Sequence, residues 1–196
     1  MLAAFKEVIN PAVILNIVTG DKLLTLKENS SESKIKKLHI KDVPENAFAF
    51  TLDHQPSGKD RRWFKQLSCY VNIGNDKGVN KGCDLILLVP EKNNNCKVLI
   101  FDIKSDKPRI KDTKKQLINS ELYVRYLMSM VHSHYDVNIK NVKFQRTIVT
   151  TDKNSLRKTS TYRPNQKTPK EKCFSTVSVN VTAHKDAYVH LGVLLR

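Results

Sequence analysis

Two apolar runs separated by a short polar turn constrain the fold of this chain more than any other feature. The runs cover residues 85–89 and 98–103, and the segment between them holds Pro90 and three consecutive asparagines, residues 93–95. Proline and asparagine favour turns and disfavour strands, so the pattern predicts a β-hairpin. Because both runs are apolar on both faces, we expect two central strands in a sheet that is covered on each side.

The hairpin brings charged residues together at its open end. If it is symmetric about Asn93, Asp84 lies opposite Asp102, and Gly82 lies opposite Lys104 and leaves the lysine room to lean toward the acids. Side chains alternate along a strand and opposed residues are about 5 Å apart, so these charges share one face. Two adjacent carboxylates raise the pKa of one of them unless a cation compensates. Mg²⁺ suits this position because it binds one or two carboxylates and keeps several waters.

These residues resemble a known motif. Gly82-Cys83-Asp84, then Asp102-Ile103-Lys104 on the next strand, then a helix carrying Gln116, is similar to the PD-(D/E)XK phosphodiesterase superfamily, the restriction-endonuclease-like nucleases. The match covers about residues 80–150, and Cys83 stands where the family's name has proline. The resemblance implies an α/β fold with a restriction-endonuclease-like core, in which helices flank a central mixed β-sheet.

The resemblance also implies the chemistry of the site. It makes Asp84, Asp102, Lys104 and Gln116 the expected catalytic set of a nuclease that hydrolyses phosphodiester bonds with Mg²⁺ or Mn²⁺. The metal would be held by the two aspartates and the backbone carbonyl of Ile103. The lysine would orient or polarise the attacking water, or neutralise charge that builds on the phosphate.

Many members of this superfamily carry one more acid on their first helix. Glu7 is the first candidate for that acid in this chain, and it is expected to be a metal ligand; Glu45 is the second candidate. Gln116 could instead be an exposed residue of the first helical turn. Asp53 and His54 could form a metal pair, although one histidine beside one aspartate is more often structural.

The charge balance points to a polyanionic partner. The chain has 34 Lys+Arg against 19 Asp+Glu, a formal net charge of +15. Nucleic acid is the expected partner, DNA ahead of RNA, and a membrane surface is the lesser alternative. The polar loop 153–172 is predicted to contact the phosphate backbone of the nucleic acid. It is expected to be partly disordered before the nucleic acid binds. The expected nucleic-acid-binding residues in this loop are Lys153, Arg157, Lys158, Arg163 and Lys167.

Two other functions stay open at this point. One is a nuclease-like module that binds nucleic acid but has lost turnover, and the other is a basic interaction protein without chemistry. The four cysteines show no metal-ligand spacing and no signal peptide is evident, so we expect a cytoplasmic protein with reduced thiols and no membrane association. A homodimer would suit the cutting of both strands of a duplex, as in restriction, phage defence or repair.

We expect a single domain over residues 1–196, with its core at about residues 45–150. The apolar spacing predicts a short helix near residue 2, and a second helix that starts at Asn10-Pro11 and ends at Gly20. A hairpin is predicted over residues 21–43, a strand over 47–53, a long helix from Asp112 or Thr113 to about Val131, and a strand over 142–150. Residues 173–196 are predicted to form a closing hairpin beside the core sheet, with a helix as the alternative for its last segment.

Overall fold

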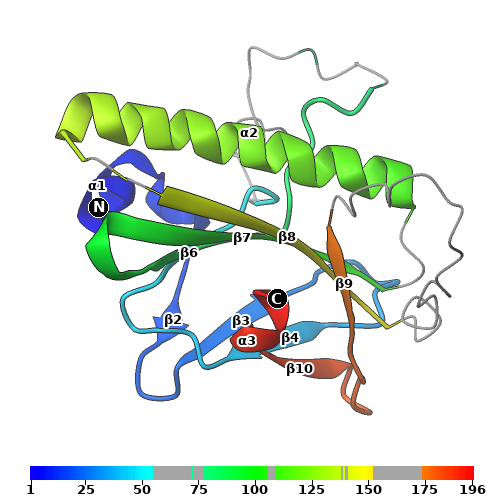
Figure 1. Cartoon of the computed structure of the whole chain (residues 1–196). Helices are drawn as coiled ribbons and strands as arrows, with labels where there is room; N and C mark the ends of the chain where they lie inside the picture. Colours follow the sequence, from blue (N-terminus) through cyan, green and yellow to red (C-terminus); the bar gives the residue numbers. More distant parts are fainter. Residues whose placement is uncertain (55–71, 73–76, 106–108, 138, 140, 152–173) are drawn as a thin grey trace, which may run out of the picture.

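The computed structural model describes residues 1–54, 72, 77–105, 109–137, 139, 141–151 and 174–196. These residues form three layers: helices, a six-stranded sheet, and a four-stranded sheet (Figure 1). Two separate clusters of buried apolar side chains lie between the layers, one on each face of the six-stranded sheet.

The six-stranded sheet is mixed. Its strands are β1 (Ile14–Leu15), β5 (Phe48–Phe50), β6 (Leu85–Pro90), β7 (Asn95–Lys104), β8 (Asn141–Thr150) and β9 (Ser175–Ser178), in that spatial order. Neighbours from β1 to β7 are antiparallel, whereas β7, β8 and β9 run parallel. A mixed sheet flanked by helices is the general class that the sequence predicted.

The β6–β7 hairpin has the predicted register. Leu85 lies opposite Phe101, and Pro90 lies opposite Cys96, so every pair is symmetric about Asn93. The turn contains the 3₁₀ segment η3 (Lys92–Asn94), in which Asn93 and Asn94 have φ angles of 59° and 58°. Asparagine tolerates this left-handed conformation better than most residues, so the asparagine run accounts for the tight turn.

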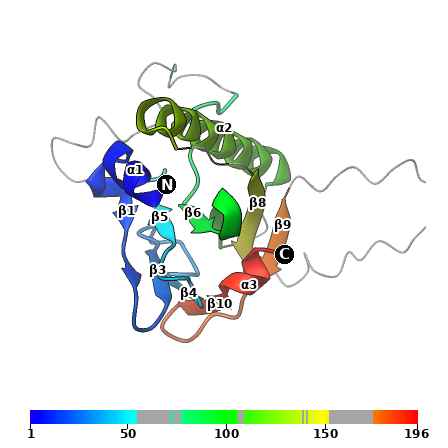
Figure 2. The same ribbon diagram turned by 60° about the vertical axis from the view of Figure 1, so that its left-hand side comes forward.

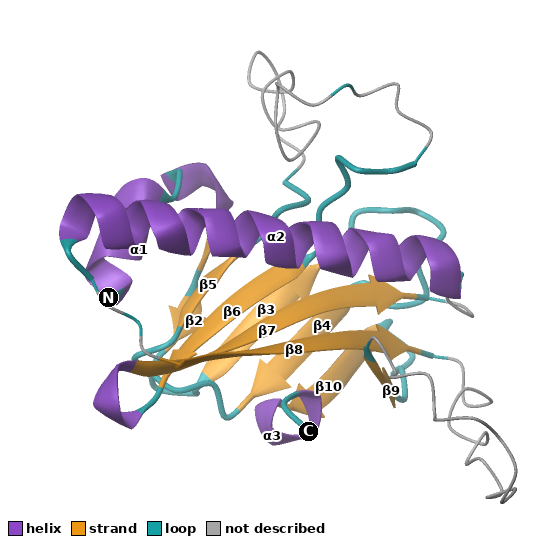
Figure 3. Cartoon of the chain, turned by 45° about the horizontal axis from the view of Figure 1, so that its top comes forward, coloured by secondary structure: helices purple, strands orange, loops and turns teal. Residues whose placement is uncertain are grey.

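One long helix, α2 (Ile110–Tyr135), crosses the sheet and connects β7 to the parallel strand β8 (Figure 3). It begins two residues before Asp112 and ends at Tyr135, four residues after the predicted end at Val131; the residue that follows, Asp136, has a φ of 52°. The shorter helix α1 (Leu2–Val8) packs in the same layer and buries Ala4 and Phe5. In the part of the chain that the structure describes, no helix combines the length and apolarity that a membrane span requires.

The four-stranded sheet covers the other face of the first sheet (Figure 2). Its strands, in spatial order, are β10 (Asp186–His190), β4 (Lys37–Lys41), β3 (Leu23–Lys27) and β2 (Ile17–Val18). The antiparallel pair β3–β4 confirms the hairpin predicted over residues 21–43. Alternate residues of each strand point inward to the shared core, and the short helix α3 (Leu191–Leu194) adds two leucines to it.

Two predicted elements are wrong. The second helix is only a 3₁₀ turn, η1 (Pro11–Val13), in which the Asn10 side chain accepts a hydrogen bond from Ala12 N at 3.0 Å. The following residues form β1 and β2, because the β-branched isoleucines and valine there find partners in β5 and β3. The closing hairpin is also wrong: β9 joins one sheet and β10 the other, and Val181, which follows β9, forms an isolated antiparallel bridge with Ala187 of β10.

Candidate active site

The open end of the β6–β7 hairpin brings the predicted residues together. Asp84 directly precedes β6, Asp102 and Lys104 lie at the end of β7, and Gln116 lies in the second turn of α2. The carboxyl groups of Asp84 and Asp102 are close enough to share a hydrogen bond. The two aspartates are therefore neighbours at the end of the hairpin.

Asp102 is fully buried. The Lys104 ammonium lies 2.5 Å from Asp102 Oδ2 as an ion pair, and Gln116 Nε2 donates a hydrogen bond to Asp102 Oδ1 at 3.3 Å. Among the described residues, Oδ2 has no hydrogen-bond partner of good geometry. A buried carboxylate is costly to ionise, and the ion pair with Lys104 offsets part of that cost.

Asp84 is only partly exposed, and its Oδ2 accepts a hydrogen bond from Ile103 N at 2.6 Å. Removal from water and repulsion by Asp102 together raise the pKa of Asp84 well above its usual range. Burial also raises the pKa of Asp102, although the Lys104 ammonium opposes that shift. Burial lowers the pKa of Lys104, but the two aspartates outweigh it and the net shift is upward, so the lysine stays protonated at neutral pH.

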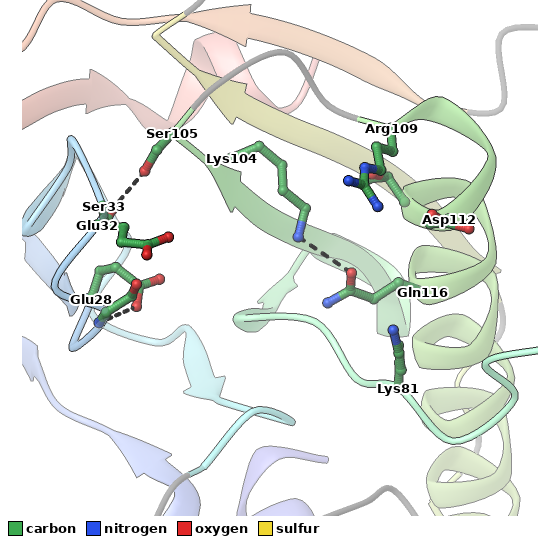
Figure 4. Close-up of a pocket in the computed structure, with 11 residues that line it drawn as sticks. Glu28, Glu32, Ser33, Lys81, Lys104, Ser105, Arg109, Asp112 and Gln116 are labelled. Carbon is green, nitrogen blue, oxygen red and sulfur yellow. Dashed lines mark hydrogen bonds between the residues drawn. The ribbon is translucent and has the colours of Figure 1, made fainter. Parts of the chain in front are cut away.

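Gln116 connects three parts of the site (Figure 4). Its Nε2 donates to Gly82 O at 2.5 Å as well as to Asp102, and its Oε1 accepts from Lys104 Nζ at 3.4 Å. The side chain therefore faces the sheet end and is not an exposed residue of the helix start. It holds the loop before β6, the end of β7 and α2 in one arrangement.

The space at Gly82 is taken up by Leu52, a neighbour that the sequence did not indicate. A Cβ at this position would lie 2.6 Å from both Cβ and O of Leu52, closer than real Cβ contacts. Leu52 also donates a backbone hydrogen bond to Cys83 O at 3.2 Å. The missing side chain thus admits the segment after β5, which packs against the loop that carries Asp84.

The structure does not bring the two helix-acid candidates to this site. Glu7 is exposed on α1 and hydrogen bonds Tyr135, the last residue of α2. At 1.5 Å per residue, Tyr135 is about 28 Å along the helix from Gln116. Glu45 is exposed in the turn before β5, at the end of the sheet that holds the β6–β7 turn. The prediction that Glu7 is a metal ligand is therefore wrong in this arrangement, because α1 packs at the far end of α2.

Glu28 is an acid near the site that the sequence did not indicate. It follows β3 and lines two pockets, one of about 390 Å³ with Asp84 and Ile103, and one of about 440 Å³ with Lys104 and Gln116. Its Oε1 accepts a hydrogen bond from Ser30 N at 2.9 Å. No motif could have found Glu28, because it belongs to the second sheet and reaches the site only through the packing of the two sheets.

The larger pocket carries charges of both signs (Figure 4). Lys81, Lys104 and Arg109 line it from the sheet end and α2, and Glu28 and Glu32 line it from the β3–β4 hairpin. The smaller pocket also contains Asp53 and His54, the metal pair considered from the sequence. Within the described residues, no three His, Cys, Asp or Glu side chains are grouped closely enough to hold a metal without other ligands.

A basic surface surrounds the start of α2. Asn119 of α2 donates a hydrogen bond from Nδ2 to Gly78 O at 2.7 Å. This contact holds the loop before β6 against the helix. Asp112 is the one acid in residues 109–115. The predicted binding loop 153–172 lies outside the described residues, so its five basic residues are not placed. The exposed cations of this basic surface are Lys77, Lys81, Arg109, Lys111 and Lys114.

No protein-family model, curated protein or solved structure matches this chain.

Proposed function

We propose that this protein is a metal-dependent nuclease that hydrolyses phosphodiester bonds in nucleic acid, with DNA as the favoured substrate. One observation carries the proposal: Asp84, Asp102, Lys104 and Gln116 meet at the end of two central strands and contact one another. This is the set of residues that the resemblance to the PD-(D/E)XK superfamily implies. Burying such charges at the end of central strands costs free energy. Buried charge clusters of this kind are found mainly at functional sites.

The residues present fit a hard divalent cation. The two carboxylates repel each other, and Asp102 is buried with the Lys104 ammonium as the cation that contacts it in the described structure. Carboxylate and carbonyl oxygens are the ligands that Mg²⁺ and Mn²⁺ prefer, so Asp84, Asp102 and the Ile103 carbonyl would hold the ion. When bound, the ion would polarise the phosphate and lower the pKa of a coordinated water.

Lys104 acts as a cation in this scheme. Its side chain is 32% exposed, and its ammonium lies between buried Asp102 and the open pocket. The two aspartates raise its pKa against the opposing effect of burial, which favours the ammonium form. It would orient the attacking water and stabilise negative charge on the phosphate. Gln116 holds the ammonium and Asp102 in place through its two ends.

The basic surface at the start of α2 would hold the substrate. Lysine and arginine contacts to phosphates position a nucleic acid without reading its sequence. This surface adjoins Gln116 and Lys104, so a bound backbone would pass directly over the site.

Cleavage of plasmid, single-stranded DNA and RNA with Mg²⁺ or Mn²⁺ tests the proposal. Lys104→Ala should lower the rate at least about a hundredfold, as expected when a group that stabilises transition-state charge is lost. Lys97→Ala is the matched control, because Lys97 lies on the same strand with a similar side-chain exposure of 38% and pairs with Glu91. Equal activity of wild type and Lys104→Ala would refute the mechanism.

A module that binds nucleic acid without turnover is the second candidate, since the described residues hold no metal cluster of three acidic, histidine or cysteine side chains. Titration calorimetry with Mn²⁺ separates the two. The nuclease proposal expects binding by the wild type and loss of binding in Asp102→Ala. Absence of metal binding by the wild type would favour the binding module or a basic interaction protein.

A further inference from the structure

The outer face of the four-stranded sheet is turned away from α2 (Figure 2) and carries none of the proposed catalytic residues. Burial alternates strictly along β3, β4 and β10, so every second residue leaves the core and faces outward. The outward residues are Leu23, Thr25 and Lys27 on β3, Lys37, His39 and Lys41 on β4, and Asp186, Tyr188 and His190 on β10.

An aromatic pair occupies the centre of this face. His39 and Tyr188 are direct neighbours in the β4–β10 register, and their rings stack with centroids 4.7 Å apart and planes 18° apart. On the other side, Thr25 Oγ1 is hydrogen bonded to His39 Nδ1 at 2.9 Å, which fixes the imidazole. Tyr188 is nevertheless 50% exposed, so an ordered ring presents half of its surface to solvent.

Lysines surround the aromatic pair. Lys41 Nζ lies 5.0 Å from the centroid of the Tyr188 ring, and Lys27 and Lys37 are exposed, directly opposed residues of β3 and β4. Of the acids near this face, Asp42 is occupied by His190, with 2.6 Å between Oδ2 and Nδ1. Asp186 is only partly exposed. The three lysines Lys27, Lys37 and Lys41 therefore outnumber the two acids Asp42 and Asp186 around the ring.

We propose that this outer face binds single-stranded nucleic acid, with a base stacked on Tyr188 and phosphates contacted by the lysines. An ordered, half-exposed aromatic ring among lysines is the usual composition of such a platform, since every base has a face that can stack. A duplex keeps its bases paired and stacked inside, so it cannot use the ring in this way. The net charge of +15 agrees with a polyanionic ligand.

The platform is continuous with the proposed active site. Thr25, which contacts His39, lines the pocket of about 390 Å³ that also contains Lys27, Asp84 and Ile103. Among the described residues, β2 pairs with Leu23 and Leu24 and with no later residue of β3. A single strand that lies across Tyr188 would therefore lead along β3 toward Asp84. The inference that the strand leads toward Asp84 rests on the proposed nuclease function. The inference that single strands bind the platform does not depend on it.

Fluorescence anisotropy with labelled oligo-dT and oligo-rU of about twelve nucleotides, and with a duplex of the same length, tests the platform. EDTA is present throughout, so the result is independent of cleavage. Tyr188→Ala should weaken single-strand binding about fivefold or more and leave duplex binding within about twofold of the wild type. Tyr126→Ala, which removes a tyrosine that is 58% exposed on α2, is the matched control and should bind as the wild type.

Two conservative variants separate stacking from folding. Tyr188→Phe keeps the ring and should retain the affinity for single strands. Tyr188→Leu keeps an apolar side chain without the ring and should bind single strands as weakly as Tyr188→Ala. The thermal unfolding temperatures of all three variants should be near that of the wild type. Wild-type affinity of Tyr188→Ala, or an equal loss on duplex, would overturn the platform. Failure of the nuclease proposal would show instead in the metal-dependent cleavage assay, which this measurement does not use.

Discussion

At the scale of single residues, the paired carboxylates decide how stability depends on pH. Asp84 and Asp102 both have raised pKa values, chiefly because they are removed from water. The folded state therefore keeps protons that the unfolded state releases above about pH 4. The stability that the pair contributes is fully present below that pH, and it is lost as the pH rises through the raised pKa values.

Asp84→Asn should consequently be more stable relative to the wild type at pH 8 than at pH 4. The amide oxygen can still accept the hydrogen bond from Ile103 N, so the substitution removes the charge and keeps the contact. Thermal unfolding of both proteins at the two pH values measures the difference. Asp136→Asn makes the same chemical change at an exposed position after the end of α2 and is the surface control. A difference between Asp84→Asn and wild type that does not change with pH would contradict this account.

Gly82 is the residue at which a single methyl group should disturb both stability and site. Gly82→Ala places Cβ 2.6 Å from backbone and side-chain atoms of Leu52, and relief of this overlap should cost about 1–3 kcal/mol. The shift would also move the carbonyl that accepts from Gln116. Gly20→Ala is the control, since nothing lies within 4 Å of its new Cβ. Chemical denaturation compares the two, and equal stability of both variants would show that the contact with Leu52 relaxes freely.

At the scale of elements, α2 packs on the sheet through one face in the described part of the chain. Leu127 is 3% exposed in the core between α2 and the six-stranded sheet, whereas Leu122 on the same helix is 61% exposed. Leu127→Ala should therefore lower the free energy of unfolding by about 2–5 kcal/mol, through lost burial and the cavity left behind.

Leu122→Ala makes the same chemical change on the solvent side and should stay within about 0.5 kcal/mol of the wild type. Urea unfolding followed by circular dichroism measures both variants. A large decrease in the free energy of unfolding of Leu122→Ala would mean that this face of α2 is covered in solution.

At the scale of the whole molecule, the layers place the candidate site where both sheets and the start of α2 meet. The surplus of positive charge there should make nucleic-acid binding strongly dependent on salt. Lys111→Ala combined with Lys114→Ala should reduce the slope of log affinity against log salt concentration by roughly 1.5, since each lost phosphate contact removes about 0.7–0.9.

Lys6→Ala combined with Lys143→Ala removes the same charge from the opposite end of the molecule. Both are exposed lysines, one on α1 and one at the start of β8. This control should leave the slope nearly unchanged. Equal slopes for the two double variants would show that the basic surface at α2 does not contact the backbone.

The elements that follow from local chemistry could be predicted from the sequence. The asparagine turn and the two apolar runs determined the β6–β7 hairpin and its register, and that register placed Asp84 beside Asp102. The helix α2 followed from the periodic spacing of its apolar residues, and the strand β8 followed from the fold pattern. Turn preferences and alternation act over a few residues, so no distant contact was needed to find them.

Only the tertiary structure decided what depends on distant partners. Residues 14–18 became strands because β5 and β3 lie beside them, and the last two strands separated because each found a different sheet. Glu28 reaches the site, and Glu7 does not, because of how the layers pack. Spacing along the chain carries no information about such contacts, since they form only when segments far apart in sequence bury their apolar faces together.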